Sequence, residues 1–222
     1  RTRSGTFTSI DFPGSDFTKA FQSNSRGDLV GNYSFDGDPV VRHGYLLRHG
    51  SFTTFDPPGS FWTQPYGIND RGEITGRYCV VQEACDDGLG NFHGFLRTRR
   101  GEYITIDVPG GHDTACFKSN SRGDVVGSYI GNRDGKHHVF ILRDGQFTKV
   151  HFPGTFETDP TPGQGAINSR GDIVSYYCDA KPCTFDNGHL HGFLRSHRGV
   201  YTIIDFPGAA TTYPTGITPR GD

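Results

Sequence analysis

The chain of 222 residues repeats itself, and this repetition constrains its fold more than any other feature of the sequence. Three short phrases recur in a fixed order. The first ends in Pro-Gly, with closing glycines 44 to 54 residues apart, and occupies 7–14, 52–59, 103–110, 147–154 and 201–208. The second is built on Arg-Gly-Asp or Arg-Gly-Glu and occupies 23–33, 67–78, 119–129, 166–177 and, in a shorter form, 216–222. The third is of the type His-Gly-Phe-Leu and occupies 43–48, 93–97, 138–143 and 191–195.

The pattern predicts four short strands in each unit. β-Branched and aromatic residues fill the strand positions, and Gly, Asn, Asp and Pro stand between them, as tight hairpins require. The chain holds 32 Gly and 13 Pro, and no useful length of it has a helical period. Four-stranded units at this spacing are typical of propeller blades, which must stack on neighbours to bury their faces. A β-sandwich is the alternative, but it does not explain the period.

Five copies of the first phrase predict an all-β, five-bladed β-propeller of four-stranded antiparallel blades, forming a single domain over 1–222. Residues 1–5 match 97–101, so the chain starts just after a third strand, and it stops at the turn after a first strand. We therefore expect the ring to be closed by N- and C-terminal strands in one blade. The middle strands of that blade are missing, so either the natural protein extends past one end or this blade is incomplete.

The His-Gly-Phe-Leu strand, the Gly-Ile-Asn-Asp-Arg-Gly turn and the Ile-Val-Gly-x-Tyr type of strand resemble the bacterial HAF-type extracellular repeats over essentially the whole chain. The resemblance implies a secreted or cell-envelope β-propeller and says little about activity. The chain departs from the pattern at three places: His151 replaces an Asp, Ser175 replaces a Gly and Thr218 replaces an Asn.

The cysteines indicate an oxidising compartment. Cys79 and Cys85 lie in one loop and Cys178 and Cys183 in another, both between a second and a third strand, and both loops are longer than their cysteine-free counterparts. Two local disulfides are the natural interpretation, which favours a secreted, periplasmic or cell-envelope protein. A zinc site is the rival, but no Cys-x-x-Cys spacing supports it. Cys116 is left over and is expected to be buried.

Charge and hydropathy exclude two classes of partner. The formal net charge is −2 with acids and bases mixed, which argues against nucleic acid. No apolar run is long enough for a transmembrane helix. We expect a monomer whose partner is a small molecule or a carbohydrate.

Two repeated features have a functional and a structural interpretation. The third-strand histidines form a possible metal ring, but we expect each to bond within its own blade, to the Asp of the first phrase or the Tyr of the second. These are His43, His93, His138 and His191. The Arg-Gly-Asp triplets suggest adhesion, yet they occupy a repeated hairpin turn in which Gly and Asp have structural roles.

The asparagine of the second phrase is a candidate metal ligand. It recurs at Asn24, Asn69, Asn120 and Asn168. Because the first strand of a blade is innermost, these amides approach the central channel, where amide oxygens suit Ca²⁺. Calcium-dependent lactonases, which are also propellers, hold Ca²⁺ there, but this is an analogy of fold. The alternative is an Asx turn before Arg-Gly.

The links between blades repeat least, so function is expected there. Exposed aromatic residues beside acids suit a sugar or small ligand. The predicted ligand-binding residues are Asp16, Phe61, Trp62, Phe156, Asp159 and Tyr213. The predicted catalytic residues are His112, Asp113 and Glu157, as general base and water-directing groups.

Three functions remain open. One is a Ca²⁺-assisted hydrolase of lactones or esters at the channel mouth; a serine hydrolase is disfavoured because no Gly-x-Ser-x-Gly elbow exists. The alternative is a non-catalytic module that binds a glycan or a surface partner. The third is a purely structural envelope repeat.

Overall fold

The computed structural model describes residues 5, 7–35, 41–81, 85, 92–155, 157–158, 165–180 and 190–221. The elements with defined bounds are β-strands in four antiparallel sheets. The first sheet holds β1 (Phe17–Ser23), β2 (Leu29–Ser34), β3 (His43–Arg48) and β4 (Ser51–Phe55). The second holds β5 (Trp62–Ile68), β6 (Ile74–Cys79), β7 (Phe92–Arg97) and β8 (Tyr103–Ile106). The third holds β9 (Gly111–Ser119), β10 (Val125–Gly131), β11 (His137–Arg143) and β12 (Gln146–Val150).

The fourth sheet keeps this plan with one change. It pairs β15 (Ile173–Cys178), β16 (Leu190–Arg195) and β17 (Tyr201–Ile203) in sequence order. The place of its first strand is divided between β13 (Glu157–Thr158) and β14 (Ala166–Ile167), which both pair with β15. The predicted repeat unit of four antiparallel strands is therefore confirmed in four sheets.

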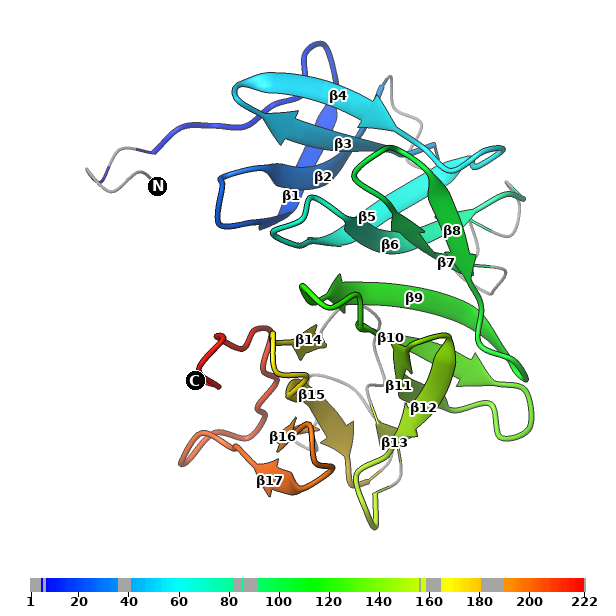
Figure 1. Ribbon diagram of the computed structural model, residues 1–222, viewed down its shortest axis with the longest axis vertical. Coiled ribbons are helices and arrows are strands. Elements are labelled where there is room, and N and C mark those ends of the chain that lie inside the picture. Colours follow the sequence, from blue (N-terminus) through cyan, green and yellow to red (C-terminus); the bar gives the residue numbers. More distant parts are fainter. Residues whose placement is uncertain are drawn as a thin grey trace.

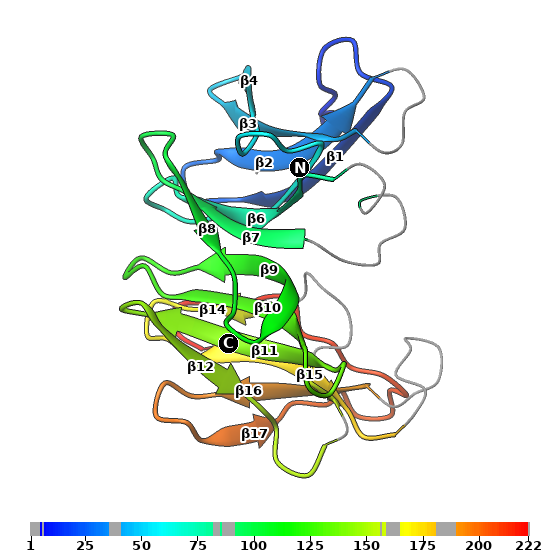
Figure 2. The same ribbon diagram turned by 90° about the vertical axis from the view of Figure 1, so that its right-hand side faces the viewer.

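The sheets follow one another in chain order as the blades of a β-propeller. In Figure 1 they succeed each other from the top of the molecule to the bottom, with both termini on the left, and Figure 2 shows them stacked from the side. The first strands of successive sheets contact each other, β1 with β5, β5 with β9 and β9 with β14, so they are innermost. Within the described residues, no helix is long and apolar enough to cross a membrane.

An extra aromatic residue interrupts the first strand of each of the first three sheets. The register between first and second strands shifts around Phe21, Tyr66 and Phe117, each of which is left without a partner in β2, β6 or β10. The three rings meet, with centroids 6.0 Å apart for Phe21 and Tyr66 and 5.8 Å apart for Tyr66 and Phe117. A β-bulge turns a side chain out of the regular pleat, and here it brings aromatic rings of neighbouring sheets into contact.

The sheets hold together because the first phrase of one unit packs on the second phrase of the next. Phe12 stacks on Tyr33 with ring centroids 3.6 Å apart, and Phe152 stacks on Tyr177 at 4.3 Å. Val108 occupies the same place in the third unit, in a core cluster to which Tyr129 packs. The Phe12 and Tyr33 rings lie almost face to face, whereas the Phe152 and Tyr177 rings are offset, an arrangement that adds roughly 1 kcal/mol beyond the burial of apolar area. The residue before Pro-Gly is therefore an anchor between sheets.

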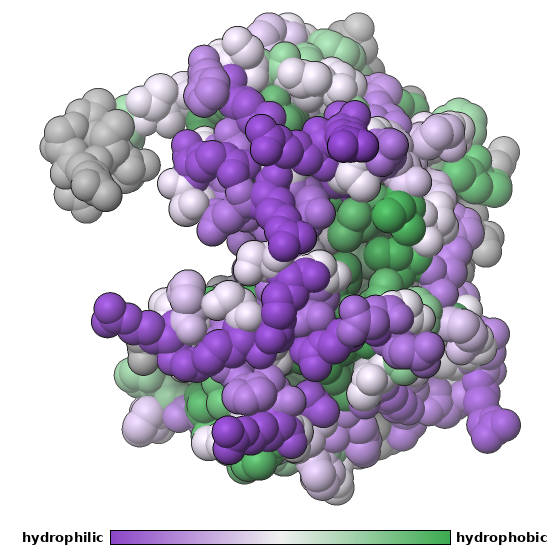
Figure 3. Space-filling model, in the orientation of Figure 1, coloured by the Kyte–Doolittle hydropathy of each residue, from purple (hydrophilic) through white to green (hydrophobic). Residues whose placement is uncertain are grey.

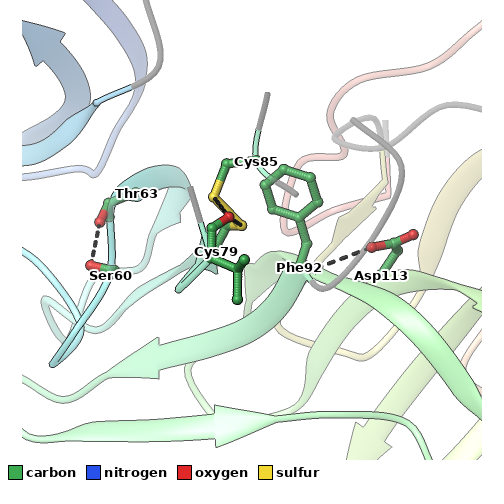
Figure 4. The surroundings of a disulfide bond; sticks show 7 residues. Ser60, Thr63, Cys79, Cys85, Phe92 and Asp113 are labelled. Carbon is green, nitrogen blue, oxygen red and sulfur yellow. Dashed lines mark hydrogen bonds between the residues drawn. A yellow bond between two sulfur atoms is a disulfide. The ribbon is translucent and has the colours of Figure 1, made fainter. Parts of the chain in front are cut away.

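The first predicted disulfide is present. Cys79 and Cys85 are bonded, with Cα atoms 5.9 Å apart (Figure 4). Cys178 is also disulfide-bonded, whereas Cys183 lies outside the described residues. Cys116 is free and fully buried, as expected, and burial raises the pKa of its thiol. The disulfide is compatible with an extracellular protein.

Reduction of this disulfide should lower stability measurably. The bond closes a loop with a sequence separation of 6, for which chain-entropy arguments give about 2 kcal/mol. Replacing both Cys79 and Cys85 with serine should lower the free energy of unfolding by that amount in urea titrations. The buried Cys116→Ser variant, which breaks no bond, is the comparison, and equal stability of the double variant and the wild type would contradict the prediction.

Candidate functional site

A cavity of about 440 Å³ lies where the first strands of the sheets end. The turns that follow β1, β5, β9 and β14 surround it together with the C-terminal turn. Its lining comprises Gln22, Ser23, Asn24, Ser25, Ile68, Asn69, Asp70, Lys118, Ser119, Asn120, Ser121, Ala166, Ile167, Asn168, Ser169, Gly216, Ile217 and Pro219. These turns point left in Figure 1, and the surface on that side is largely hydrophilic (Figure 3). The volume lies in the range of small-ligand pockets, about 300–1,000 Å³.

The four predicted asparagines reach this cavity and build its wall. In the third sheet, Asn120 Oδ1 accepts the backbone N–H groups of Arg122 and Asp124, at 2.9 and 3.1 Å. Its Nδ2 donates to Asp124 Oδ2 at 2.8 Å and to the backbone carbonyl of Asn168 in the next turn at 3.1 Å. Asn24, Asn69 and Asn168 repeat the same pattern. The Asx turn is therefore present, and it also joins each turn to its neighbour.

This arrangement does not fit calcium on Asn24, Asn69, Asn120 and Asn168. Each side-chain oxygen already accepts two backbone N–H groups, and the group turned toward the next unit is the N–H₂ donor, which repels a cation. Within the described ranges, no three His, Cys, Asp or Glu side chains gather closely enough to hold a metal ion. Calcium binding stays a prediction that the donor set does not support.

The Arg-Gly-Asp triplets make hydrogen bonds within their own turn and to the neighbouring turn. The Asp28 side chain, 2% exposed, accepts hydrogen bonds from Arg26, Arg48 and Asn24. The Arg48 guanidinium holds the pKa of Asp28 down to about 2. The arginines also reach the neighbouring turn: Arg26 donates to the carbonyl of Asp70, and Arg122 to that of Arg170 at 2.6 Å. A carboxylate engaged in this way is not offered to an adhesion partner.

The third-strand histidines are structural as well. Nδ1 of His43, His93 and His191 bonds to Asp56, Asp107 and Asp205 at 2.8, 2.9 and 2.7 Å. Each ring also lies beside the second-strand tyrosine of its own sheet. In the third sheet, where His151 replaces the aspartate, His138 bonds instead to Asp134 at 3.0 Å and to Lys149 at 3.1 Å. The predicted bonding within each blade is confirmed.

The cavity retains polar groups that the turns do not use. The exposed hydroxyls of Ser121 and Ser169 make no hydrogen bond within the described part of the chain, and Oε1 of Gln22 is buried without a partner. The Lys118 ammonium donates to the carbonyl of Thr215 at 2.8 Å, and burial lowers the pKa of Lys118. Asp70 Oδ1 accepts the backbone N–H of Ser25 at 2.9 Å. The free hydroxyls of Ser121 and Ser169 thus line the cavity together with Lys118.

Sequence reasoning missed these residues, although a signal existed. Serine follows the asparagine at Ser25, Ser121 and Ser169, whereas Asp70 and Pro219 hold this position in the other two units. A residue that changes in two of five units is one that the common fold does not dictate.

The predicted catalytic residues lie at the other end of the first strands. Six residues of β9 separate His112 from Lys118, or about 20 Å. Nδ1 of His112 bonds to Asn132 Oδ1 at 2.8 Å, and its Nε2 is 3.8 Å from Asp113 Oδ2. Asp113 has a left-handed φ of 51°, and its Oδ1 accepts the backbone N–H of Phe92 at 3.1 Å. Glu157 contributes a backbone pair with Cys178.

The predicted ligand-binding residues are distributed over this same end. Asp16, Phe61 and Tyr213 are exposed. Trp62 is half-buried and packs on Phe92 with ring centroids 5.2 Å apart. Phe156 and Asp159 lie outside the described residues. The structure therefore connects Trp62 to Asp113 through Phe92.

The comparisons with known proteins show a fold and no family. No family model and no curated protein matches the chain. Among solved structures, a Hadza microbial sialidase is similar with a TM-score of 0.50 and 11% identity, over 87% of this chain and 45% of that one. The Aleuria aurantia lectin in complex with Fucα1-6GlcNAc gives 0.47 and 10%, over 90% and 67%. A putative gluconolactonase gives 0.47 and 16%, over 88% and 67%. The chain spans less than half the length of the sialidase, and at such identity the likeness concerns the fold alone.

Proposed function

We propose that this protein is a carbohydrate-binding β-propeller module that holds a small polyhydroxyl ligand in its central cavity. The observation that carries the proposal is the convergence of turn hydroxyls, amides and Lys118 on one cavity of about 440 Å³. Alternating donors and acceptors suit a sugar, whose hydroxyls act as both. The turns are joined by hydrogen bonds, so the cavity is preorganised and little ordering entropy opposes binding.

We further propose that the ring has five blade positions. The C-terminal turn supports this, since Asn168 and Arg170 bond to the carbonyls of Thr218 and Arg220 at 3.3 and 2.7 Å, as in the other turns. Phe206 supports it too. It stands at the place of Phe12 and Phe152, but its side chain is 73% exposed, and among the described residues no tyrosine stacks on it.

Binding of neutral sugars to the folded chain, measured by calorimetry, tests the function. The Ser169→Phe variant fills the cavity from an exposed turn position and should weaken binding by about tenfold or more, because the ring occupies the space of the ligand. Ser51→Phe, at an exposed position of β4 away from the cavity, is the matched control and should bind like the wild type.

Three results would overturn the proposal. One is the absence of binding to any sugar by folded protein. Another is unchanged binding by Ser169→Phe. The third is turnover of lactones or aryl esters that EDTA abolishes and Ca²⁺ restores, which would favour the calcium-assisted hydrolase instead.

A further inference from the structure

Arg77 has an unusual environment on β6. Its guanidinium carbon lies 4.2 Å from the ring centroid of Phe92 and 5.1 Å from that of Trp62. The side chain is half-buried, and its Nε is buried without a hydrogen-bond partner. Across the described residues, the side chain of Arg77 makes no hydrogen bond and no ion pair. Leaving a buried donor unpaired costs about 1–3 kcal/mol, and more for a charged group.

The fold does not require an arginine at this position. The register places Arg77 opposite Gly94 in β7, and the same place in the other sheets is held by Asn32, Ser128 and Tyr176. Those three side chains are 0%, 1% and 0% exposed. Smaller or uncharged residues therefore complete the interface between sheets, and only the second sheet places a cation there.

The surroundings of Arg77 are fixed from two sides. The backbone N–H of Phe92 donates to Asp113 of the third sheet, and the ring of Phe92 lies beside the Cys79–Cys85 disulfide (Figure 4). Trp62 contacts Phe92 edge to face, with an angle of 66° between the rings. Two aromatic rings held in this way orient the guanidinium before any ligand arrives, which lowers the entropic cost of binding.

We propose that Arg77, with Trp62 and Phe92, binds the carboxylate of an acidic saccharide at the end of the second sheet opposite the central cavity. The planar fork of a guanidinium matches the two oxygens of a carboxylate, and aromatic rings beside it favour a sugar ring over a bare ion. A single arginine balances one negative charge, whereas a phosphate dianion would need more cations. The seven residues of β5, from Trp62 to Ile68, separate the two sites by about 20 Å.

The single tryptophan of the chain reports on this site directly. Since Trp62 is the only tryptophan, its intrinsic fluorescence can be followed while galacturonate, galactose or inorganic phosphate is added. Wild-type protein should give a saturable change with galacturonate and no comparable change with galactose or phosphate. Addition of salt should weaken the response, because the contact is between opposite charges.

Substitutions at position 77 distinguish a ligand-binding role of Arg77 from a packing role. Arg77→Asn introduces the residue that the first sheet carries at this position, so it should fold, and it should weaken galacturonate binding by about tenfold or more. Arg77→Lys keeps the positive charge but lacks the planar guanidinium, so its affinity for galacturonate should lie between those of the wild type and Arg77→Asn. Arg198→Asn, at an exposed turn, is the matched control. Equal binding by wild type and a folded Arg77→Asn, or equal responses to galactose and galacturonate, would overturn the proposal. Ser169→Phe should leave this response unchanged, which distinguishes it from binding in the cavity.

Discussion

Replacing Gly127 with alanine is expected to destabilise the protein by about 3 kcal/mol or more. A Cβ atom at Gly127 would lie 2.1 Å from the backbone oxygen of Ala115 and 2.6 Å from the ring of Phe140. The oxygen belongs to β9, two residues before the bulge at Phe117, so it moves only if the innermost strand moves. Urea denaturation of the variant gives the loss as a shift in midpoint at constant slope.

The fourth sheet supplies the control. Ser175 holds the place of Gly127 there, fully buried, and its hydroxyl has no hydrogen-bond partner. The strand beside it is the short β14, whose pairing ends at Ala166 with Val174. Ser175→Gly should therefore change the free energy of unfolding by only about 1 kcal/mol or less, because the lost packing and the relieved hydroxyl offset each other. A Gly127→Ala variant as stable as Ser175→Gly would contradict this account.

Features that the units share could be predicted from the sequence, whereas features of a single unit could not. The four-stranded unit followed from phrases shared by all repeats, and the third phrase at 43–48 coincides with β3. Contacts that recur among the units could be inferred because their partners recur at nearly the same spacing. Examples are the bond of His43 with Asp56, which three units make, and the Asx turn of Asn120. The departure at Ser175 was visible too, but its reason lies in the divided first strand, which no local pattern reveals.

The candidate sites were harder to predict from the sequence, because the repeated phrases show only what the units have in common. The cavity forms where turns separated by 45 to 51 residues bond to one another, and its free hydroxyls, those of Ser121 and Ser169, stand directly after the asparagines of these turns. Arg77 occupies an ordinary strand position in the sequence. Its significance appears only when the rings of Trp62 and Phe92 and the missing counter-charge are seen together.

Replacing Asp28 with asparagine should lower the free energy of unfolding at pH 7 by about 2 kcal/mol, the second large effect. The carboxylate accepts hydrogen bonds from Arg48 at 3.0 Å and from Arg26 at 3.1 Å, and a neutral amide cannot replace both. The pKa of Asp28 is lowered to about 2 by Arg48 first, then by Asn24 and Arg26, against the opposing effect of burial. A drop of that size below the unfolded value corresponds to roughly 2 kcal/mol.

The pH dependence has a definite sign. Because the folded pKa of Asp28 is depressed, its contribution is fully present above the unfolded pKa of about 4 and is lost as the pH falls toward 2. Wild-type stability should therefore decline through this window, while the Asp28→Asn variant declines less steeply. Asp16→Asn, which removes an exposed carboxylate, should follow the wild type. Denaturation curves at a series of pH values from 7 to 2 make the comparison. Parallel declines in the free energy of unfolding of wild type and Asp28→Asn would show that the hydrogen bonds of Asp28 contribute nothing to acid stability.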